Sequence, residues 1–291
     1  MRYEGSIYRP PSEANSLILQ ITIGCSHNRC TFCVAFMDKK YRERELAEIE
    51  KDINETASTL QGVKRIFLAD GNAMAMQTDK LLVVLNKLYS AFPKLERVGI
   101  YATPQDLLEK SKEELTAIKE AGLNIVYLGV ESGNEEILTW IRKGATSDEI
   151  VEAGQRARAA GLVLSVTVIN GLGGTEKMEE HARETAEVLN KIDPEYLGLL
   201  TLMVVEGTPI ARQLARGEFK LPGQLEILRE IEMMLQSLEL SNCVFRCNHA
   251  SNYLPLKGDL PKDKQKLLKA LEKVRLSGDL SHLRPEYMRA L

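Results

Sequence analysis

The sequence predicts an α/β protein with a largely parallel sheet, and three observations support this fold class. Apolar runs rich in β-branched residues recur at regular intervals along the 291-residue chain, and stretches with helical periodicity separate them. Hydrophobic residues make up 44% and charged residues 27%, which is typical of a globular protein. Strands that alternate with helices in this way are expected to form βαβ units, whose strands run parallel.

Six strands are expected, and each is a short apolar run bounded by glycine or polar residues. They span residues 17–23, 65–69, 97–101, 124–130, 162–169 and 196–204. Six βαβ units form either a doubly wound sheet or part of a (β/α) barrel, since a closed barrel needs eight. No GxGxxG motif follows the first run, so the sequence does not support a dinucleotide-binding fold.

The expected helices carry one apolar stripe each, as Leu46, Ile49 and Ile53 show in the first of them. Ser111 and Glu114 have the spacing of a capping box. The helices span residues 42–60, 78–89, 112–122, 135–142, 147–160, 175–191, 224–238 and 262–276. Because the alternation stops near residue 212, we expect an N-terminal extension (1–16), a core (17–212) and a C-terminal extension of helices and loops (213–291).

Charge and hydropathy exclude several classes of protein. The formal charge is −3, which gives no overall attraction to nucleic acid. No apolar run reaches the length of a membrane span, and the N-terminus lacks the apolar stretch of a signal peptide. The sequence therefore predicts a cytoplasmic protein that binds no membrane and for which nucleic acid is not the favoured partner.

Three of the five cysteines lie within nine residues, directly after the first strand. Cys25, Cys30 and Cys33 have the spacing C-x4-C-x2-C. Three thiolates this close can ligate three irons of a cubane cluster, which leaves the fourth iron open. Zinc bound by the same cysteines and His27 is an alternative, whereas a disulfide is not expected in the cytosol.

The cysteine segment resembles the cluster motif of radical S-adenosylmethionine (SAM) enzymes. The usual spacing in that family is C-x3-C-x2-C, one residue shorter, and Phe32 matches the aromatic residue before the last cysteine. The resemblance extends from about residue 17 to residue 212 and is to the branch of anaerobic coproporphyrinogen oxidases and methylthiotransferases. It implies a partial (β/α)6 barrel of the TIM type, a [4Fe–4S] cluster on the three cysteines, and SAM contacted by Phe32.

The resemblance implies that two segments hold the methionine part of SAM. Asp70, Gly71 and Asn72 occupy the place of a Gly-Gly-Glu-like segment that binds the methionine amine, with Asn72 in place of the acid. Lys143, with Arg142 beside it, stands where a cation of the family pairs with the methionine carboxylate. The structural alternatives are a plain turn after a strand and a solvated helix end.

Two further segments are implied to hold the nucleoside. Glu131 and Ser132 follow the fourth strand, where the family contacts the ribose region. The fifth strand resembles the family's adenine-binding strand, whose backbone reads the base edge. Ser165 and Thr167 have the period-two spacing of residues on one strand face, so their hydroxyls either meet the ribose or are bonded within the core. The implied adenine-binding residues are Thr167, Val168 and Ile169.

The C-terminal extension contains a polar segment over residues 243–256. Cys247 and Tyr253 are candidates for donating hydrogen to a substrate radical. Cys243, Cys247 and His249 can also contribute to a second metal site, although no fourth ligand is evident. The alternative is a segment that closes the barrel, with its polar groups bonded to backbone. The sequence does not decide among these roles.

The resemblance implies an enzyme that cleaves SAM reductively to a 5′-deoxyadenosyl radical, which abstracts hydrogen from a substrate. A small-molecule substrate is favoured, and the cluster needs an electron donor such as a flavodoxin or ferredoxin. Three alternatives stay open: a heme- or cluster-binding chaperone, a tRNA-modifying radical SAM enzyme and a zinc-stabilised binding protein. The sequence does not identify the substrate.

Overall fold

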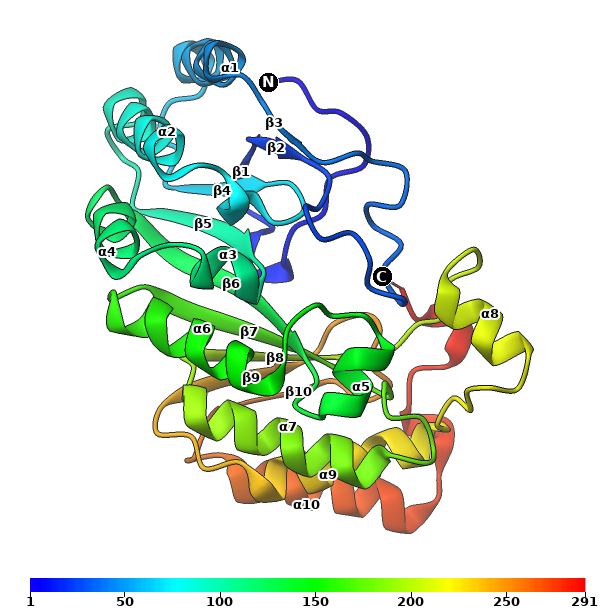
Figure 1. Ribbon diagram of the computed structural model, residues 1–291. Helices are drawn as coiled ribbons and strands as arrows, with labels where there is room; N and C mark the ends of the chain where they lie inside the picture. The colour runs from blue at the N-terminus through cyan, green and yellow to red at the C-terminus, as the bar shows by residue number, and fades with distance from the viewer. Residues whose placement is uncertain (291) are drawn as a thin grey trace. The chain divides into compact units, whose positions relative to one another are not determined.

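The computed structural model describes residues 1–290, which divide into two compact units (Figure 1). The first unit comprises Met1–Asn28, Ala35–Leu128 and Ala153–Leu164. The second comprises Arg29–Val34, Gly129–Glu152 and the chain from Ser165 onward. Each unit is described by itself below. The domain boundaries expected from the sequence, after residues 16 and 212, stay predictions.

The strands of the first unit are parallel and stand in chain order. They are β1 (Leu17–Gln20), β4 (Arg65–Ala69), β5 (Arg97–Ala102) and β6 (Leu123–Glu131), of which the last continues into the second unit. Ile66 to Ala69 are all fully buried, as expected of a strand covered on both faces. A separate antiparallel pair joins β2 (Thr22–Ile23) to β3 (Arg42–Glu43).

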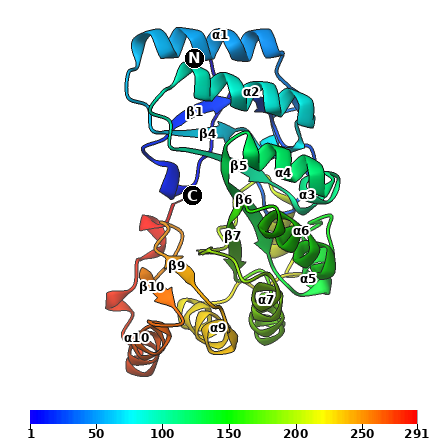
Figure 2. The ribbon, with the colours of Figure 1, turned by 90° about the vertical axis from the view of Figure 1, so that its left-hand side faces the viewer.

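The helices of the first unit follow the strands in the expected alternation. They are α1 (Leu46–Thr59), α2 (Thr78–Ala91), α3 (Pro104–Leu108), α4 (Lys112–Glu120) and the second half of α6 (Ser147–Ala159), with short 3₁₀ helices at Pro11–Glu13 and Ala73–Ala75. Helices α1 and α2 lie side by side (Figures 1 and 2). The capping box of α4 is confirmed, because Ser111 Oγ accepts from the amide of Glu114.

The second unit contains three parallel strands and one antiparallel strand. Strands β7 (Val163–Asn170), β8 (Tyr196–Thr201) and β9 (Cys243–Cys247) pair in parallel, and β10 (Leu256–Leu260) pairs antiparallel to β9. Helix α9 lies between α7 and α10 (Figure 2). The helices are α5 (Glu135–Trp140), α7 (Met178–Ile192), α8 (Pro209–Ala215), α9 (Gln224–Ser237) and α10 (Lys264–Ser277), with 3₁₀ turns at Leu280–His282 and Glu286–Met288.

Two predicted bounds are wrong: the end of the strand over residues 17–23 and the start of the helix over residues 42–60. The strand is interrupted at Ile21, and the helix begins at Leu46 because Arg42–Glu43 pairs with β2 instead. The amide of Arg44 donates to the carbonyl of Ile21 (3.0 Å), which continues this pairing. Apolar periodicity alone does not reveal a two-residue strand pair, so tertiary pairing decides these boundaries.

The polar segment over residues 243–256 begins with strand β9 and ends at the first residue of β10. In β9 the side chains of Cys243, Phe245 and Cys247 are buried, and those between them are more exposed. This is the period-two pattern of a half-buried strand, but a run of five residues with two cysteines is too short to establish it. The two strands extend the parallel strands of this unit beyond the expected last strand.

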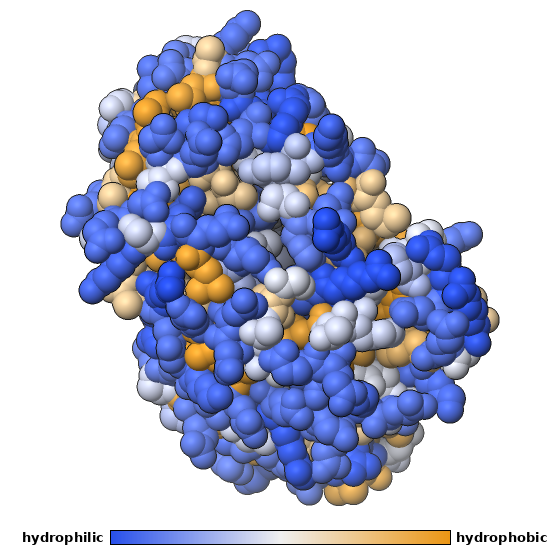
Figure 3. Space-filling view, in the orientation of Figure 1, coloured by the Kyte–Doolittle hydropathy of each residue, from blue (hydrophilic) through white to orange (hydrophobic). Residues whose placement is uncertain are grey.

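None of the described helices is long and apolar enough to cross a membrane. The face of the molecule shown in Figure 3 is mostly hydrophilic, with small apolar patches scattered over it. Isolated apolar side chains of this kind are normal on a protein surface.

Candidate functional site

In the first unit the segment Asp70–Asn72 follows β4 and packs directly against the loop that leads to the cysteines. Gly71 has a φ of 44°, and a Cβ atom there would lie 2.0 Å from the carbonyl oxygen of Gly24 and 2.7 Å from the Cα atom of Cys25. Only a residue without a side chain permits this approach. The backbone after β4 therefore touches the start of the cysteine loop.

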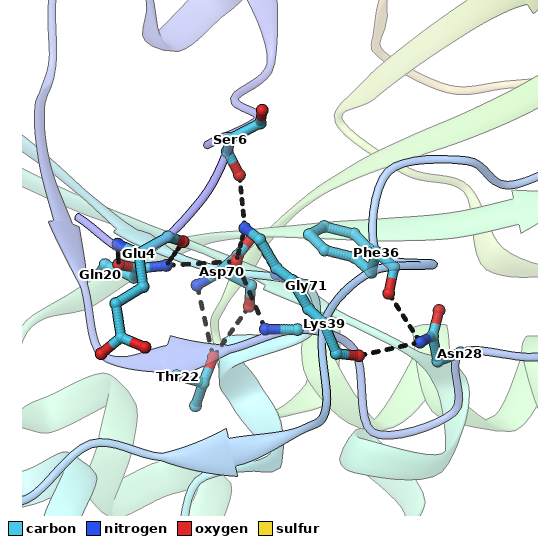
Figure 4. Close-up of polar contacts among 10 residues, drawn as sticks. Glu4, Ser6, Gln20, Thr22, Asn28, Phe36, Lys39, Asp70 and Gly71 are labelled. Atoms are coloured by element: carbon cyan, nitrogen blue, oxygen red, sulfur yellow. Dashed lines mark hydrogen bonds and ion pairs between the residues drawn. The ribbon is translucent and has the colours of Figure 1, made fainter.

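Asp70 is fully buried, and its carboxylate accepts four hydrogen bonds. Its Oδ2 accepts from Lys39 Nζ (2.6 Å), Gln20 Nε2 (3.3 Å) and the amide of Gly24 (3.4 Å), as Figure 4 shows in part. Its Oδ1 accepts from the amide of Gly71 (2.9 Å). Lys39 Nζ also donates to the carbonyl of Ser6 (Figure 4), so this ion pair fixes the loop after the cysteines to the segment after β4.

Asn72 bonds to the residue that follows Cys25. Its Oδ1 accepts from the amide of Ser26 (2.8 Å), and its Nδ2 donates to Ser26 Oγ (2.7 Å). The same Nδ2 donates to the carboxylate of Asp106, at 2.8 Å and 3.0 Å from its two oxygens. The three residues thus connect the cysteine loop, the end of β4 and the start of α3.

Cys25 is partly exposed and receives a backbone hydrogen bond. The amide of Asn28 donates to Cys25 Sγ at 3.5 Å, and Asn28 adopts the left-handed conformation with a φ of 40°. Its Nδ2 donates to the carbonyls of Phe36 (2.8 Å) and Lys39 (3.3 Å), which closes the loop on itself. Backbone donors to a cysteine sulfur are typical of iron–sulfur ligands, whose negative charge they stabilise.

The other two cysteines belong to the second unit and are also partly exposed. The amide of Cys33 donates to the carbonyl of Cys30 (3.2 Å), which makes a turn between them. Thr31 anchors this turn, because its amide donates to the carbonyl of Ile141 (2.9 Å) and its carbonyl accepts from the amide of Ile210 (3.1 Å). The phenyl ring of Phe32, within the turn, is only partly buried.

Glu131 and Lys143 form an ion pair at the end of β6. Lys143 Nζ donates to Glu131 Oε1 at 3.2 Å, and both side chains are nearly buried. Glu131 has a φ of 66°, and its Oε2 has no hydrogen-bond partner although it is buried. The predicted helix over residues 135–142 ends at Trp140, and Arg142, with a φ of 55°, is exposed beside the buried Lys143.

Strand β7 alternates between a more buried and a less buried face. Ser165, Thr167 and Ile169 share the less buried face, while Val168 and Asn170 lie on the other. Asn170 is fully buried; its Nδ2 donates to the carbonyl of Leu200 (3.0 Å), but its Oδ1 has no partner. Ser132 is buried as well, and its Oγ accepts from the amide of Asn134 (3.1 Å).

The residues present fit SAM in one specific respect. Among the buried oxygens without hydrogen-bond partners in the described part of the second unit, Glu131 Oε2 and Asn170 Oδ1 lie at the ends of β6 and β7. A buried acceptor without a donor is costly, and a ligand that carries hydroxyl or ammonium groups supplies the missing donors. The sequence analysis missed Asn170, although a polar residue at the end of an apolar strand is a recognisable signal.

The thiols of the cysteine loop suit iron, because soft thiolates are the ligands of iron–sulfur clusters. Within residues 1–290, no three His, Cys, Asp or Glu side chains are grouped closely enough to form a metal site. The assignment of Cys25, Cys30 and Cys33 as cluster ligands therefore stays a prediction.

The polar residues of the C-terminal segment are bonded within the second unit. Cys243 and Cys247 are buried at the two ends of β9, and burial raises the pKa of each thiol to about 12. Tyr253 donates its hydroxyl to Glu286 (2.8 Å) and accepts from Arg289 Nη1 (2.7 Å), and burial raises its pKa to about 12. His249 Nδ1 lies 2.9 Å from Ser251 Oγ, and burial lowers its pKa.

Comparison with known proteins identifies the family. The model of the radical SAM superfamily matches residues 19–189, which is more than half of the chain. The chain belongs to the radical SAM superfamily. This finding agrees with the resemblance of the cysteine motif, and the family implies a [4Fe–4S] cluster and SAM as cofactors.

Curated relatives of this radical SAM chain differ in activity. It is 28% identical over 224 residues to the heme chaperone HemW of Bacillus subtilis (74% of the chain, 58% of the relative). It is 27% identical over 212 residues to a tRNA-2-methylthio-N(6)-dimethylallyladenosine synthase of Chlorobium phaeobacteroides (68% and 45%). The chain thus spans about half the length of the curated relatives it matches.

Solved radical SAM structures confirm the expected fold, a partial TIM-type (β/α) barrel. Coproporphyrinogen III oxidase (HemN) of Escherichia coli matches with a TM-score of 0.58 and 20% identity, over 76% of this chain and 52% of HemN. Methylornithine synthase (PylB) matches with a TM-score of 0.54 and 18% identity, over 77% and 63%. At these identities the likeness shows the fold alone.

Proposed function

We propose that this chain is a radical SAM enzyme whose [4Fe–4S] cluster is held by Cys25, Cys30 and Cys33. The observation that carries the proposal is the pair of hydrogen bonds between Asn72 and Ser26, at 2.7 Å and 2.8 Å. They join the cysteine loop to the segment with which the family binds the methionine amine. When bound, the cluster supplies the electron that cleaves SAM to methionine and the 5′-deoxyadenosyl radical.

The residues of the chain bind and orient the two cofactors. The amide of Asn28 stabilises the charge on Cys25, and the buried pair of Lys39 and Asp70 holds the cysteine loop in place. In the second unit Lys143 offers a cation to the methionine carboxylate, and Glu131 Oε2 accepts from the ribose. The list of proposed SAM contacts is Phe32, Asp70, Gly71, Asn72, Glu131, Ser132, Arg142, Lys143, Ser165, Thr167, Val168 and Ile169.

The partners of the reaction follow from the same chemistry. A small electron carrier such as a flavodoxin or ferredoxin is proposed as the reductant. A small molecule is proposed as the substrate, because the formal charge of −3 gives no overall attraction to nucleic acid. Cluster thiolates must stay reduced, which suits the cytoplasm.

The deciding experiment reconstitutes the protein anaerobically with iron and sulfide, then adds SAM and a strong reductant. We expect 5′-deoxyadenosine, detected by mass spectrometry, and its loss in Cys30→Ala. Cys243→Ala is the matched control, because this thiol begins β9 and belongs neither to the proposed cluster nor to the candidate hydrogen donors. A protein that binds zinc in place of iron, or an intact cluster that yields no 5′-deoxyadenosine, would contradict the proposal.

The likeness to HemW, which is named a heme chaperone, favours heme binding as a second candidate function. Titration with heme tests it through the Soret band. A saturable shift together with no cleavage of SAM would favour a chaperone. A gel-shift assay with tRNA tests the methylthiotransferase-like alternative in the same way.

A further inference from the structure

Asp106 is a buried carboxylate, and its neighbouring cation, the buried Lys110, forms no ion pair with it. It lies in the first turn of α3 and is 3% exposed, and its oxygens accept from the amide of Thr103 (2.7 Å) and from Asn72 Nδ2 (2.8 Å). Lys110 donates instead to the carbonyl of Met76 (3.0 Å), and the effect of its charge on the pKa of Asp106 is smaller than the effect of burial. Buried charges are normally paired, because hydrogen bonds alone repay little of the cost of desolvation.

The neighbouring acid is already neutralised. Asp70 pairs with Lys39 and accepts from Gln20 and two backbone amides, so its charge already has a partner (Figure 4). Asn72 is uncharged and stands where the family has an acid. Asp70 therefore has an ion-pair partner, whereas Asp106 has only the more distant charge of Lys110.

We propose that Asp106 supplies the negative charge that the α-ammonium group of SAM requires, in place of the acid that Asn72 replaces. This inference rests on the proposed function. Asp106 is a positioning residue, because it acts through Asn72. Both Nδ2 hydrogens of Asn72 are taken by Asp106 and Ser26 Oγ, so its Oδ1 faces the cysteine loop with one lone pair left for an ammonium group.

The ionisation of Asp106 supports this assignment. Burial raises its pKa to about 6, so the carboxylate is held at neutral pH at a cost in folding free energy. Asp106 also closes the capping box of α3, in which Thr103 is the N-cap residue, so this carboxylate has a structural role as well. Carboxylates kept charged at such a cost are frequent at functional sites, where a ligand provides the missing cation.

The test exchanges the acid and the amide between the two positions. The reconstituted holoprotein and its D106N, N72D and N72D/D106N variants are compared by equilibrium dialysis against SAM and against 5′-methylthioadenosine, which lacks the amino acid. Since hydrogen bonds to charged groups contribute about 10- to 100-fold in affinity, we expect D106N to lower the affinity for SAM by that factor. Binding of 5′-methylthioadenosine is expected to change less than about 2-fold, and N72D/D106N to bind SAM within about 3-fold of wild type.

Asp79→Asn, which removes an exposed carboxylate from α2 of the same unit, is the matched control. Thermal unfolding confirms that each variant is folded. The inference is overturned if D106N binds SAM as wild type does, if it weakens both ligands equally, or if the exchange restores nothing. A wild-type protein that binds SAM but forms no 5′-deoxyadenosine overturns the proposed function and leaves the comparison of affinities valid. One that binds no SAM overturns both.

Discussion

Lys39 and Asp70 form an ion pair whose side chains are 5% and 0% exposed. Removing one partner from such a pair leaves an uncompensated buried charge, which costs about 3–5 kcal/mol. We therefore expect Lys39→Met to lower the free energy of unfolding by about that amount, measured by urea denaturation. Lys39→Met with Asp70→Asn should cost less than the sum of the single changes, and additive effects would contradict the coupling.

Gly71 is expected to tolerate no side chain. A Cβ atom would overlap the carbonyl of Gly24, and the φ of 44° adds strain, so Gly71→Ala should displace the cysteine loop and reduce the iron retained after reconstitution. Gly62→Ala is the control, since Gly62 also has a positive φ but no atom within 4 Å of the added carbon. Equal iron content in both variants would contradict the expectation.

The pKa of Asp106, raised to about 6 by burial, predicts a pH-dependent stability of the protein without SAM. A raised carboxyl pKa stabilises the folded state below the unfolded pKa of about 4, and this contribution is lost as the pH rises to about 6. Wild type should therefore lose stability relative to Asp106→Asn between these values. Denaturation at several pH values measures the difference, and a constant difference would count against the buried charge.

At the scale of single residues, the sequence indicates which side chains suit the proposed chemistry better than it indicates which side chains contact one another. The spacing of Cys25, Cys30 and Cys33 is visible in the chain, and so is Asn72 at the position where the resemblance implies an acid. The partnership of Asn72 with Asp106 is not visible, because the two side chains come from different strand ends and meet only through tertiary pairing. Lys39 carried no sequence signal either, since an isolated lysine in a loop is normally solvated.

Helices α7 and α9 are connected by a fully buried contact. His181 Nδ1 lies 2.8 Å from Glu230 Oε1, which also accepts from the amide of Gly171 (2.9 Å), and His181 Nε2 lies 3.4 Å from the carbonyl of Glu131. The carboxylate of Glu230 thus connects α9 to α7 and to the turn after β7, while His181 contacts the end of β6.

Glu230→Ala should lower the free energy of unfolding by about 3–5 kcal/mol, because it leaves two buried polar groups without a partner. Chemical denaturation measures the change, and Glu230→Gln, whose amide can bond to both groups, should be milder. Glu239→Ala removes an exposed glutamate and should stay within about 0.5 kcal/mol of wild type. Similar costs for Glu230→Ala and Glu239→Ala would refute the role of the contact.

Elements with strong periodicity were predicted from sequence, and short ones were not. Strands β4 to β8 and the long helices lie within a few residues of their expected bounds, because each carries a full apolar face. Strands β2, β3, β9 and β10 have two to five residues, and helices α3 and α8 five and seven. Elements of this length depend on pairing and capping, and their sequence periods are too short to read.

For the whole molecule, cofactor binding should appear as a gain in thermal stability. A ligand that binds only the folded state at 100 times its Kd stabilises it by about 2.7 kcal/mol, which corresponds to a rise in Tm of a few degrees. We expect SAM to raise the Tm of the reconstituted protein and to have no such effect on Cys30→Ala. Differential scanning calorimetry under anaerobic conditions measures the Tm of both proteins. An equal rise in Tm would show that SAM binding does not depend on the cluster, which contradicts the expectation.

The hydrogen bond between Asn72 and Asp106 has a consequence for how related sequences diverge. If one negative charge near Asn72 and Asp106 is enough for the ammonium group of SAM, natural selection can keep that charge at either position. Carboxylates at both positions would repel each other. A chain with no carboxylate at either position would leave the ammonium group without a counter-charge. Lineages should therefore carry an acid at position 72 or at position 106, with the loss of one accompanied by the gain of the other. Positions 72 and 106, which are 34 residues apart in the chain, are therefore expected to covary.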